Sequence, residues 1–288
     1  MANVNDNQPE RLRAVAEQLV SEAADFVRRR RAEMLGAGAA GADSAAVRTA
    51  VQTKSSRTDP VTKADTETEK LVRGRLGEMR PGDSILGEEG GGTSSGAVVR
   101  WVVDPIDGTV NFLYGIPAYA VSLAAQVGGV SVAGAVADVV GGQVYSAAVG
   151  CGAHVLDRGA RRRLRCNDVD ELAMALLSTG FGYSPQRRAA QAELLAQLMP
   201  QVRDVRRLGS AALDLCMVAA GRLDAHYEHG LHEWDWAAGA LIAAEAGAVV
   251  VLPGADDPGA GLTLAAAPGV AAQLIEALDR CAGLRPLP

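Results

Sequence analysis

Consecutive apolar segments, separated by pairs of glycines, fill the middle of this sequence and leave it few ways to fold. Val and Ala dominate four such segments, at residues 98–103, 119–127, 130–140 and 144–149. Gly128-Gly129 and Gly141-Gly142 separate the last three, and adjacent glycines favour hairpin turns because they adopt positive φ angles without steric cost. The pattern therefore predicts an antiparallel sheet with long central strands, and Ile85-Leu86 predicts a shorter strand before it.

Helical periodicity precedes the predicted sheet. Apolar residues recur at helical spacing between residues 9 and 31, which predicts an amphipathic helix that ends in the arginine run 28–31. Cations suit a helix C-terminus, because its unpaired carbonyls concentrate negative potential there. Ala and Gly then dominate residues 35–47, which predicts a surface loop. A second helix is expected after Pro60 and ends at Met79, before a Pro-Gly pair.

Helical and extended segments alternate in the second half of the sequence. We expect helices at about residues 187–199, 211–220, 236–246 and 269–281. We expect strands at about residues 202–208, 223–227, 248–252 and 262–266. Such an order predicts a layered α/β architecture with mixed sheets instead of a single dinucleotide-binding repeat. The sequence has no internal repeat and no segment long enough to be a linker, so residues 1–288 are expected to form one domain.

The composition argues against several classes of protein. Asp and Glu total 34 against 28 Lys and Arg, a formal charge of −6, so the chain is a poor candidate for wrapping nucleic acid or lying on anionic lipid. The four cysteines form no C-x-x-C pair, which favours reduced thiols in a cytoplasm. Charged residues or glycines interrupt every apolar run, and the first residues lack an apolar signal core. We therefore expect a soluble, cytoplasmic protein.

The segment WVVDPIDGTVNF at residues 101–112 carries the strongest chemical signal. An apolar strand delivers Asp104 at its end, a turn follows, and Asp107 comes three residues later. Two carboxylates on one tight turn cannot both stay ionised at close range without a cation, and oxygen ligands favour a hard ion such as Mg²⁺. The amides of Gly108 and Thr109 lie where a helix is expected to begin, so they can face a phosphate. Asp-Pro and Asp-Gly also mark plain turns, so both interpretations stay open at this point.

Three further carboxylates strengthen the metal interpretation. Glu88 follows an apolar strand and a glycine in ILGEEG, and Asp235 stands in EWDWAAG at the start of a strongly apolar helix. Asp65 lies in DPVTKAD, near the start of the second predicted helix. For Asp65 and Asp235 a simpler interpretation exists, because an Asp at the start of a helix often caps it.

At these positions the sequence resembles the inositol monophosphatase family, within the wider group of lithium-sensitive, magnesium-dependent sugar phosphatases. The resemblance runs in order over about residues 54–250, and its segments are 54–65, 87–89, 101–112, 209–212 and 228–239. The motifs DPIDGT and WDxAAG are specific in combination. Val110 replaces the Thr that many members have before Asn-Phe, but it follows the metal and phosphate residues. The resemblance implies an αβαβα sandwich of the sugar phosphatase type.

The resemblance also implies ligands for two Mg²⁺ ions and leaves a third ion open. Glu88, Asp104 and the carbonyl of Ile106 would hold the first ion. Asp104, Asp107 and Asp235 would hold the second, with Asp104 as a bridge. Two cations about 3.5–4 Å apart polarise a phosphoryl group and lower the pKa of a bound water, so no covalent enzyme intermediate is needed.

The implied reaction is the hydrolysis of myo-inositol 1-phosphate or a close relative. Asp65 would orient the Thr109 hydroxyl, which together with Glu88 would position the attacking water. Contacts with this phosphorylated polyol are implied for Asp107, Gly108, Thr109, Ala211, Glu228 and Asp235. The resemblance further implies a homodimer and inhibition by Li⁺. Fructose 1,6-bisphosphate, histidinol phosphate or a sulfated nucleotide stay open as substrates of the same fold. The basic run Arg203, Arg206 and Arg207 bears on the bisphosphate, because Arg206 or Arg207 could reach the pocket.

Two further hypotheses compete with a phosphatase. His226, His229 and His232 lie close together in the sequence and suggest a zinc site, but an extended stretch points His226 and His229 to opposite faces. A regulatory member of the same fold could instead bind RNA or a protein through the basic run 161–163. The complete set of carboxylates argues against a purely non-catalytic role. Neither a P-loop motif nor a serine nucleophile elbow occurs, which argues against those two kinds of enzyme.

Overall fold

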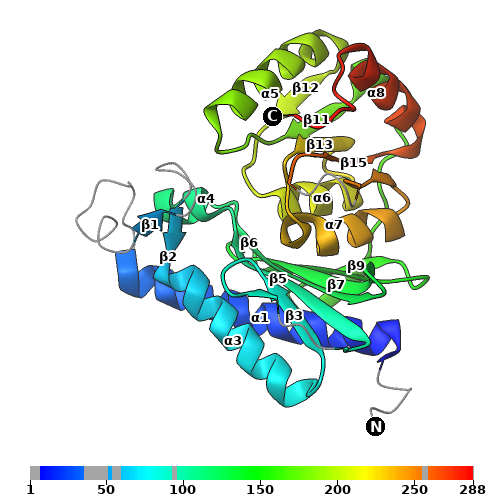
Figure 1. Ribbon diagram of the computed structural model, residues 1–288. Coiled ribbons are helices and arrows are strands. Elements are labelled where there is room, and N and C mark those ends of the chain that lie inside the picture. Colours follow the sequence, from blue (N-terminus) through cyan, green and yellow to red (C-terminus); the bar gives the residue numbers. More distant parts are fainter. Residues whose placement is uncertain (1–6, 36–50, 54–59, 93–95, 255–258, 288) are drawn as a thin grey trace.

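The computed structural model describes residues 7–35, 51–53, 60–92, 96–254 and 259–287. Figure 1 shows these residues in five layers, with helices on the outside, two sheets beneath them and helices between the sheets. Four clusters of buried apolar residues fill the interfaces between successive layers. The αβαβα sandwich expected from the resemblance is therefore confirmed.

The first layer consists of α1 (Pro9–Leu35) and α3 (Lys63–Met79), which lie side by side (Figure 1). Nearby, β1 (Val51–Thr53) pairs with β2 (Pro60–Thr62) in a small antiparallel sheet. The first predicted helix is confirmed but is longer than expected, because the arginine run 28–31 does not end it. Most of the expected loop at 35–47, and residues 54–59 of the resemblance, lie outside the described residues.

The arginines of this run fix α1 to the rest of the molecule. Arg28 donates from Nη1 to the carbonyl of Val139 at 2.8 Å, and Arg31 donates from Nε to the carbonyl of Phe112 at 2.8 Å. Arg30 pairs with Glu67 on α3 at 2.7 Å. The basic run therefore makes structural contacts between layers and does not serve as a helix terminus.

Eight strands of the described chain form the large sheet, in the order β10-β9-β8-β7-β6-β5-β3-β4. Neighbouring strands are antiparallel except for β3 and β5, which are parallel. The predicted hairpins are confirmed, since Gly128, Gly129 and Gly142 have φ angles of 59°, 80° and 70°. Three strands of this sheet, β4, β9 and β10, were not predicted. In chain order the strands are β3 (Ser84–Gly87), β4 (Gly91–Gly92), β5 (Val99–Asp107), β6 (Ala120–Val127), β7 (Val130–Asp138), β8 (Gln143–Ala148), β9 (Ala153–Asp157) and β10 (Ala160–Arg163).

The middle layer consists of α6 (Ala211–Ala219) and α7 (Glu233–Glu245), which contact both sheets. In β5, Trp101 and Val103 are buried among residues of α1 and α3, whereas Val102 is buried among residues of α6 and α7. Because successive side chains of a strand point to opposite faces, a sheet covered on both sides is apolar at every position. This arrangement explains the continuous apolar segments of the sequence.

The smaller sheet has five strands in the described residues, in the order β12-β11-β13-β15-β14. Its first three strands are parallel, while β15 is antiparallel to both β13 and β14. Two helices, α5 (Pro185–Leu198) and α8 (Pro268–Arg280), cover its outer face. Of these elements only β11 was not predicted. The strands are β11 (Leu176–Thr179), β12 (Asp204–Arg206), β13 (Ala225–His229), β14 (Val249–Val251) and β15 (Leu262–Ala266).

Short 3-10 helices at Leu172–Met174 and Met199–Gln201 flank this sheet, and α4 (Thr109–Tyr114) follows β5. All four cysteines are free thiols. Among the described residues we find no helix with the length and apolar character that a membrane span requires.

Candidate active site

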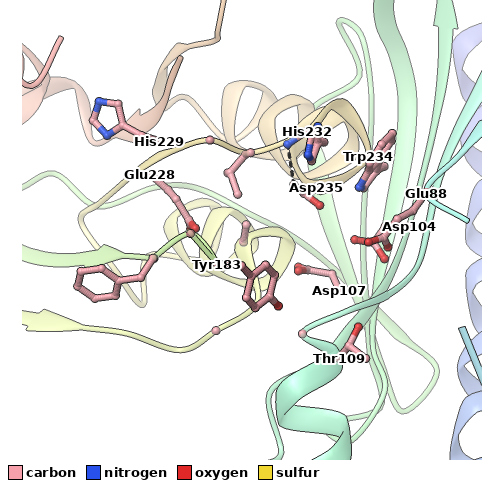
Figure 2. Close-up of a pocket in the computed structure, with 18 of the residues that line it drawn as sticks. Glu88, Asp104, Asp107, Thr109, Tyr183, Glu228, His229, His232, Trp234 and Asp235 are labelled. Carbon is pink, nitrogen blue, oxygen red and sulfur yellow. Dashed lines mark hydrogen bonds between the residues drawn. The ribbon is translucent and has the colours of Figure 1, made fainter. Parts of the chain in front are cut away.

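A cavity of about 490 Å³ lies where the end of β5 meets the segments that precede α4, α6 and α7. Figure 2 shows that acidic side chains gather on one side of it, with Glu228 on another. With one exception, all the site residues expected from the sequence line this cavity. They are Glu88, Asp104, Ile106, Asp107, Gly108, Thr109, Ala211, Glu228 and Asp235. The exception is Asp65, which lies behind Thr109.

The irregular last part of β5 places Asp104 and Asp107 at the cavity. The pairing of β5 with β6 is irregular between these two residues, so the chain bends here. Asp104 is buried and accepts a hydrogen bond at Oδ1 from the amide of Ile106 at 3.0 Å. Desolvation raises the pKa of Asp104 well above its usual range, and the charges of Glu88, Asp107 and Asp235 raise it further. Both predicted carboxylates therefore lie at the cavity, but the expected turn between them is wrong, because β5 continues through Asp107 as an irregular strand.

Asp107 is held by the start of α6. Its Oδ2 accepts from the hydroxyl of Ser210 at 2.6 Å and from the amide of Ala212 at 2.7 Å. Desolvation raises the pKa of Asp107 to about 6, although these two hydrogen bonds lower it. Ser210 was not predicted as a site residue, and its contact with Asp107 joins positions 103 residues apart.

Asp235 caps a helix and also lines the cavity. It is the third residue of α7, and its Oδ2 accepts from the amide of His232 at 2.7 Å, which completes a capping box. The same side chain lines the cavity beside Asp107 (Figure 2). Desolvation raises the pKa of Asp235 well above its usual range, and the negative charges of Asp107 and Glu88 raise it further. The helix cap and the carboxylate at the site are therefore one residue.

Asp65 likewise caps a helix and contacts the site. Its Oδ2 accepts from the amide and the hydroxyl of Thr62 at 2.9 and 2.5 Å, at the start of α3. Its Oδ1 lies 3.1 Å from the hydroxyl of Thr109, which lies at the same distance from the carbonyl of Ile106. Desolvation raises the pKa of Asp65 to about 7. The expected contact between Asp65 and Thr109 is present.

Gly108 is a glycine for steric reasons. Its φ angle is +96°, and a Cβ there would lie 3.0 Å from the backbone oxygens of Ala118 and Gly209. A larger residue would be strained by both its backbone angle and these contacts. Gly108 precedes Thr109, the first residue of α4, so the backbone passes close to the cavity at this point.

The opposite part of the cavity combines Glu228 with an arginine. Desolvation raises the pKa of Glu228 to about 8, while the positive charge of Arg207 lowers it. Arg207 lines the cavity, whereas Arg206 is exposed and pairs with Asp204 at 2.6 Å. Of the two arginines considered from the sequence, Arg207 is the one that reaches the pocket.

Residues 180–184 and Arg187 line the cavity but were not predicted. They follow β11, whose four residues were too short to give a strand signal. Tyr183 points into the cavity in Figure 2. Trp234 and His232 also line it, and their rings stack with centroids 4.8 Å apart. The motif WDxAAG could have indicated Trp234, since it directly precedes Asp235.

The three clustered histidines have different surroundings. His226 Nδ1 lies 3.0 Å from the hydroxyl of Ser178, and His229 Nε2 lies 2.8 Å from the carbonyl of Gly283. His232 stacks on a tryptophan instead. Desolvation lowers the pKa of His226 to about 3, so its imidazole is neutral. These contacts give no support to a shared zinc site.

The donor set on the acidic side of the cavity fits a hard cation. Glu88, Asp104, Asp107 and Asp235 supply oxygen atoms, and charge repulsion among them raises the pKa of Asp104. Within the described residues, no three His, Cys, Asp or Glu side chains are arranged as a ready-made metal site.

Comparisons with known proteins agree over nearly the whole chain. The sequence profile described as the inositol monophosphatase family matches residues 8–282. An inositol-1-monophosphatase from Mycobacterium leprae (strain TN) is 65% identical over 293 residues, which cover 99% of this chain and 99% of that protein. A Nus factor SuhB from Pasteurella multocida (strain Pm70) is 36% identical and covers 80% of this chain and 86% of that protein.

A solved structure is similar as well. The structure of Mycobacterium tuberculosis SuhB has a TM-score of 0.82 and 58% sequence identity, and it covers 97% of this chain and 100% of that chain. Profile, sequence and structure thus support the resemblance that the motifs indicated. The chain therefore belongs to the inositol monophosphatase family and is a phosphatase.

Proposed function

We propose that this protein hydrolyses myo-inositol 1-phosphate to inositol and phosphate, with Mg²⁺ as its cofactor. The observation that carries the proposal is the group of four carboxylates, from Glu88, Asp104, Asp107 and Asp235, on one side of the cavity (Figure 2). The Mycobacterium leprae relative, which matches 99% of this chain, bears the name inositol-1-monophosphatase. The name of this relative supports the substrate, and the set of carboxylate oxygens supports the cofactor.

The proposed ligands are those expected from the motifs. Glu88, Asp104 and the carbonyl of Ile106 would hold one Mg²⁺ ion, and Asp104, Asp107 and Asp235 would hold a second. When bound, Mg²⁺ supplies positive charge that offsets the repulsion among the carboxylates and withdraws charge from the phosphoryl group. Whether a third ion binds is a separate question that a metal titration answers.

Protein groups around the phosphate would position the reactants. Gly108 and Thr109 would contact the phosphate, and Glu88 and Thr109 would hold the attacking water. The Thr109 hydroxyl lies 3.1 Å from both Asp65 Oδ1 and the carbonyl of Ile106, so these two acceptors confine its proton and thereby its lone pairs. The contact with Asp65 is the step of the proposal that the geometry supports most directly.

Three other residues would bind the polyol. Ala211, Glu228 and Asp235 all line the cavity. Asp235 lies beside Asp107, whereas Glu228 lies on another side of the cavity (Figure 2). The carboxylate of Glu228 can accept hydrogen bonds from ring hydroxyls, which gives a charge-assisted bond when the group is ionised. Asp107 would contact both an ion and the substrate.

The direct test is phosphate release from a panel of phosphorylated polyols, with and without Mg²⁺. We expect inositol 1-phosphate to be hydrolysed with the highest kcat/KM and activity to disappear on chelation. Turnover that persists in the absence of divalent cations would contradict the proposed cofactor. Inhibition by Li⁺ is part of the same proposal, and it is measured in the same assay.

Arg207 favours a second candidate substrate, fructose 1,6-bisphosphate. It places a positive charge at the cavity, close enough to Glu228 to lower the pKa of that carboxyl, where a second phosphate could bind. If this is the substrate, Arg207→Gln lowers kcat/KM for the bisphosphate much more than for inositol 1-phosphate. Efficient cleavage of the bisphosphate with negligible turnover of inositol 1-phosphate would make it the preferred assignment.

A regulatory role in RNA binding is not favoured. Arg161 of the basic run donates to Glu17 through two bonds of 2.8 and 2.7 Å, and Arg162 lies 3.6 Å from Asp157. Much of the positive charge that would attract RNA is therefore balanced by acidic partners. The Pasteurella relative is named a Nus factor, so RNA retention by this protein at several salt concentrations remains a worthwhile control.

The proposal includes a homodimer in the cytoplasm. In each protomer, residues 1–288 would form one domain. The four free thiols support a reducing compartment. The packing of α6 and α7 against both sheets supports a single domain. Light scattering would test the dimer, and a single cooperative unfolding transition would support one domain.

A further inference from the structure

Helix α3 carries a second acidic residue that contacts the site from behind. Glu69 is buried, with 2% of its surface exposed, in a region where a charged side chain needs partners. It lies four residues after Asp65 and four before Arg73, so the three side chains share one face of the helix. Asp65 contacts Thr109, as described above, and the partners of Glu69 lie in the turn that carries Glu88.

The turn between β3 and β4 wraps around the Glu69 carboxylate. Its Oε2 accepts from the amide of Glu89 at 2.7 Å, and its Oε1 accepts from the amide of Gly90 at 2.9 Å. A Cβ at Gly90 would lie 2.7 Å from Oε1, and a Cβ at Gly87 would overlap the same carboxylate. The two glycines thus let the backbone approach Glu69 closely on both sides of Glu88.

Arg73 completes this contact. Its Nε donates to Glu69 Oε1 at 2.7 Å, and its Nη2 donates to the carbonyl of Gly91 at 2.6 Å. One arginine therefore connects the Glu69 carboxylate with the far end of the turn. Glu69 and Arg73 together bind the backbone at three successive residues, 89, 90 and 91, directly after Glu88. We call this pair the α3 clamp.

We propose that the α3 clamp is a positioning device for Glu88, which sets the affinity of the acidic cluster for Mg²⁺ without touching the ion or the substrate. The proposal rests on the proposed function, because it takes Glu88 as a metal ligand. A ligand on an exposed, glycine-rich turn loses conformational freedom when it binds an ion. The clamp removes much of that freedom in advance, so less binding energy is lost.

The test compares Glu69→Gln with Glu67→Gln. Glutamine at 69 has one acceptor oxygen in place of two, so it cannot serve both turn amides and Arg73 together. Glu67 lies on the same helix and pairs with Arg30 at 2.7 Å, so its replacement removes a carboxylate and an ion pair without touching the turn. It is the matched control.

Calorimetry with Mg²⁺ alone supplies a readout that does not depend on turnover. We expect Glu69→Gln to weaken Mg²⁺ binding about 10- to 100-fold, the range found for residues that orient metal ligands, while Glu67→Gln changes it less than about twofold. At saturating Mg²⁺ the KM for substrate should stay at its wild-type value. Equal Mg²⁺ affinity in folded Glu69→Gln and wild type, or an equal loss in Glu67→Gln, would overturn the proposal.

Hydrogen exchange provides a second readout and covers the case in which Glu69→Gln does not fold. The amides of Glu89 and Gly90 should exchange slowly in the wild type, because both donate to a buried carboxylate. Arg73→Lys keeps the positive charge but loses the planar fork that reaches both partners, so exchange at these amides should rise together with the Mg²⁺ dissociation constant. Fast exchange in the wild type, or a rise in only one of the two quantities, would contradict the clamp.

The outcomes separate this proposal from the proposed function. A wild type that binds Mg²⁺ but releases no phosphate from any polyol phosphate would contradict the function and leave the clamp intact. If the wild type has Mg²⁺-dependent activity and Glu69→Gln and Glu67→Gln both bind Mg²⁺ with the wild-type affinity, the clamp alone is contradicted.

Discussion

The replacement Glu228→Gln tests how this protein distinguishes a polyol phosphate from other phosphate esters. Glu228 lies on the wall of the cavity away from most of the acidic cluster, and the proposed function gives it a hydroxyl of the substrate as partner. Glutamine has nearly the same shape, so the replacement changes charge and hydrogen bonding with little change in packing. The pKa of Glu228, raised to about 8 by desolvation, then determines the pH at which the two residues differ.

The expected effect follows from this pKa. A hydrogen bond to a charged group contributes about 1.5–3 kcal/mol, against about 0.5–1.5 kcal/mol for a neutral pair. Below pH 8 Glu228 is mainly protonated in the metal-free protein, so glutamine resembles it and KM should rise by less than about threefold. At pH 9 the carboxylate is ionised, and KM should rise about tenfold. Since Asp107 raises the pKa of Glu228, a cation held by Asp107 moves this transition to lower pH.

The assay is phosphate release from inositol 1-phosphate and from an aryl phosphate without ring hydroxyls, between pH 6 and pH 9. Both substrates carry a phosphate, so any effect that acts through Arg207 or the metal ligands appears with both. We expect the KM ratio of variant to wild type to rise with pH for inositol 1-phosphate and to stay near one for the aryl phosphate. Equal ratios for both substrates, or a ratio that falls with pH, would refute a role for Glu228 in reading the polyol.

The same shift affects stability. The folded-state pKa of Glu228 lies above the unfolded value of 4.5, so the folded state binds its proton more tightly. The associated stability is fully present below pH 4.5 and is lost as the pH rises to 8, by at most about 5 kcal/mol at 1.36 kcal/mol per pH unit. The metal-free variant Glu228→Gln has no carboxyl at this position and does not show this loss. Its free energy of unfolding in urea, relative to that of the wild type, should therefore increase from pH 4.5 to pH 8. A constant difference would contradict the pKa shift.

Three further outcomes are expected. Asp235→Asn keeps an acceptor for the amide of His232 but removes a charge from the cluster. We therefore expect kcat to fall more than about 100-fold with little change in Tm. Near-normal turnover at modest Mg²⁺ would show that Asp235 is only a helix cap. Ca²⁺ in place of Mg²⁺ should inhibit phosphate release, because it is larger and accepts looser coordination, and equal rates would contradict an octahedral site. Gly108→Ala should lower the free energy of unfolding by about 1–3 kcal/mol, and an unchanged urea midpoint would show that the turn relaxes.

The local signals of the sequence predicted much of the fold. The long strands β5 to β8 were predicted because apolar runs and paired glycines act over a few residues. The strand β11 was not, since its four residues carry no periodicity and their pairing partners lie far along the chain. That omission also left Tyr183 and Arg187 out of the predicted site. The order of the layers came from the family resemblance and not from any local pattern.

For the site, sequence patterns located the residues but not their partners. Asp65 and Asp235 each fitted two interpretations. The helix caps are confirmed, and because a carboxylate has two oxygens, the same residues can also contact Thr109 or line the cavity. Ser210 and Glu69 were not predicted, because their contacts join segments 103 and 20 residues apart. A serine at the start of a helix does not indicate which distant carboxylate it contacts. A glutamate in the middle of a helix does not indicate which distant backbone amides it binds.

The middle helices explain why the acidic cluster can exist before an ion binds. Asp107 and Asp235 accept hydrogen bonds at the N-terminal ends of α6 and α7, where unpaired amides favour negative charge. These bonds lower both pKa values, yet desolvation and mutual repulsion outweigh them and leave both raised. The folded chain thus holds its carboxylates in place through Oδ2 while their charges remain unfavourable. Because a divalent cation would relieve that repulsion, its binding should release protons, and its affinity should rise with pH.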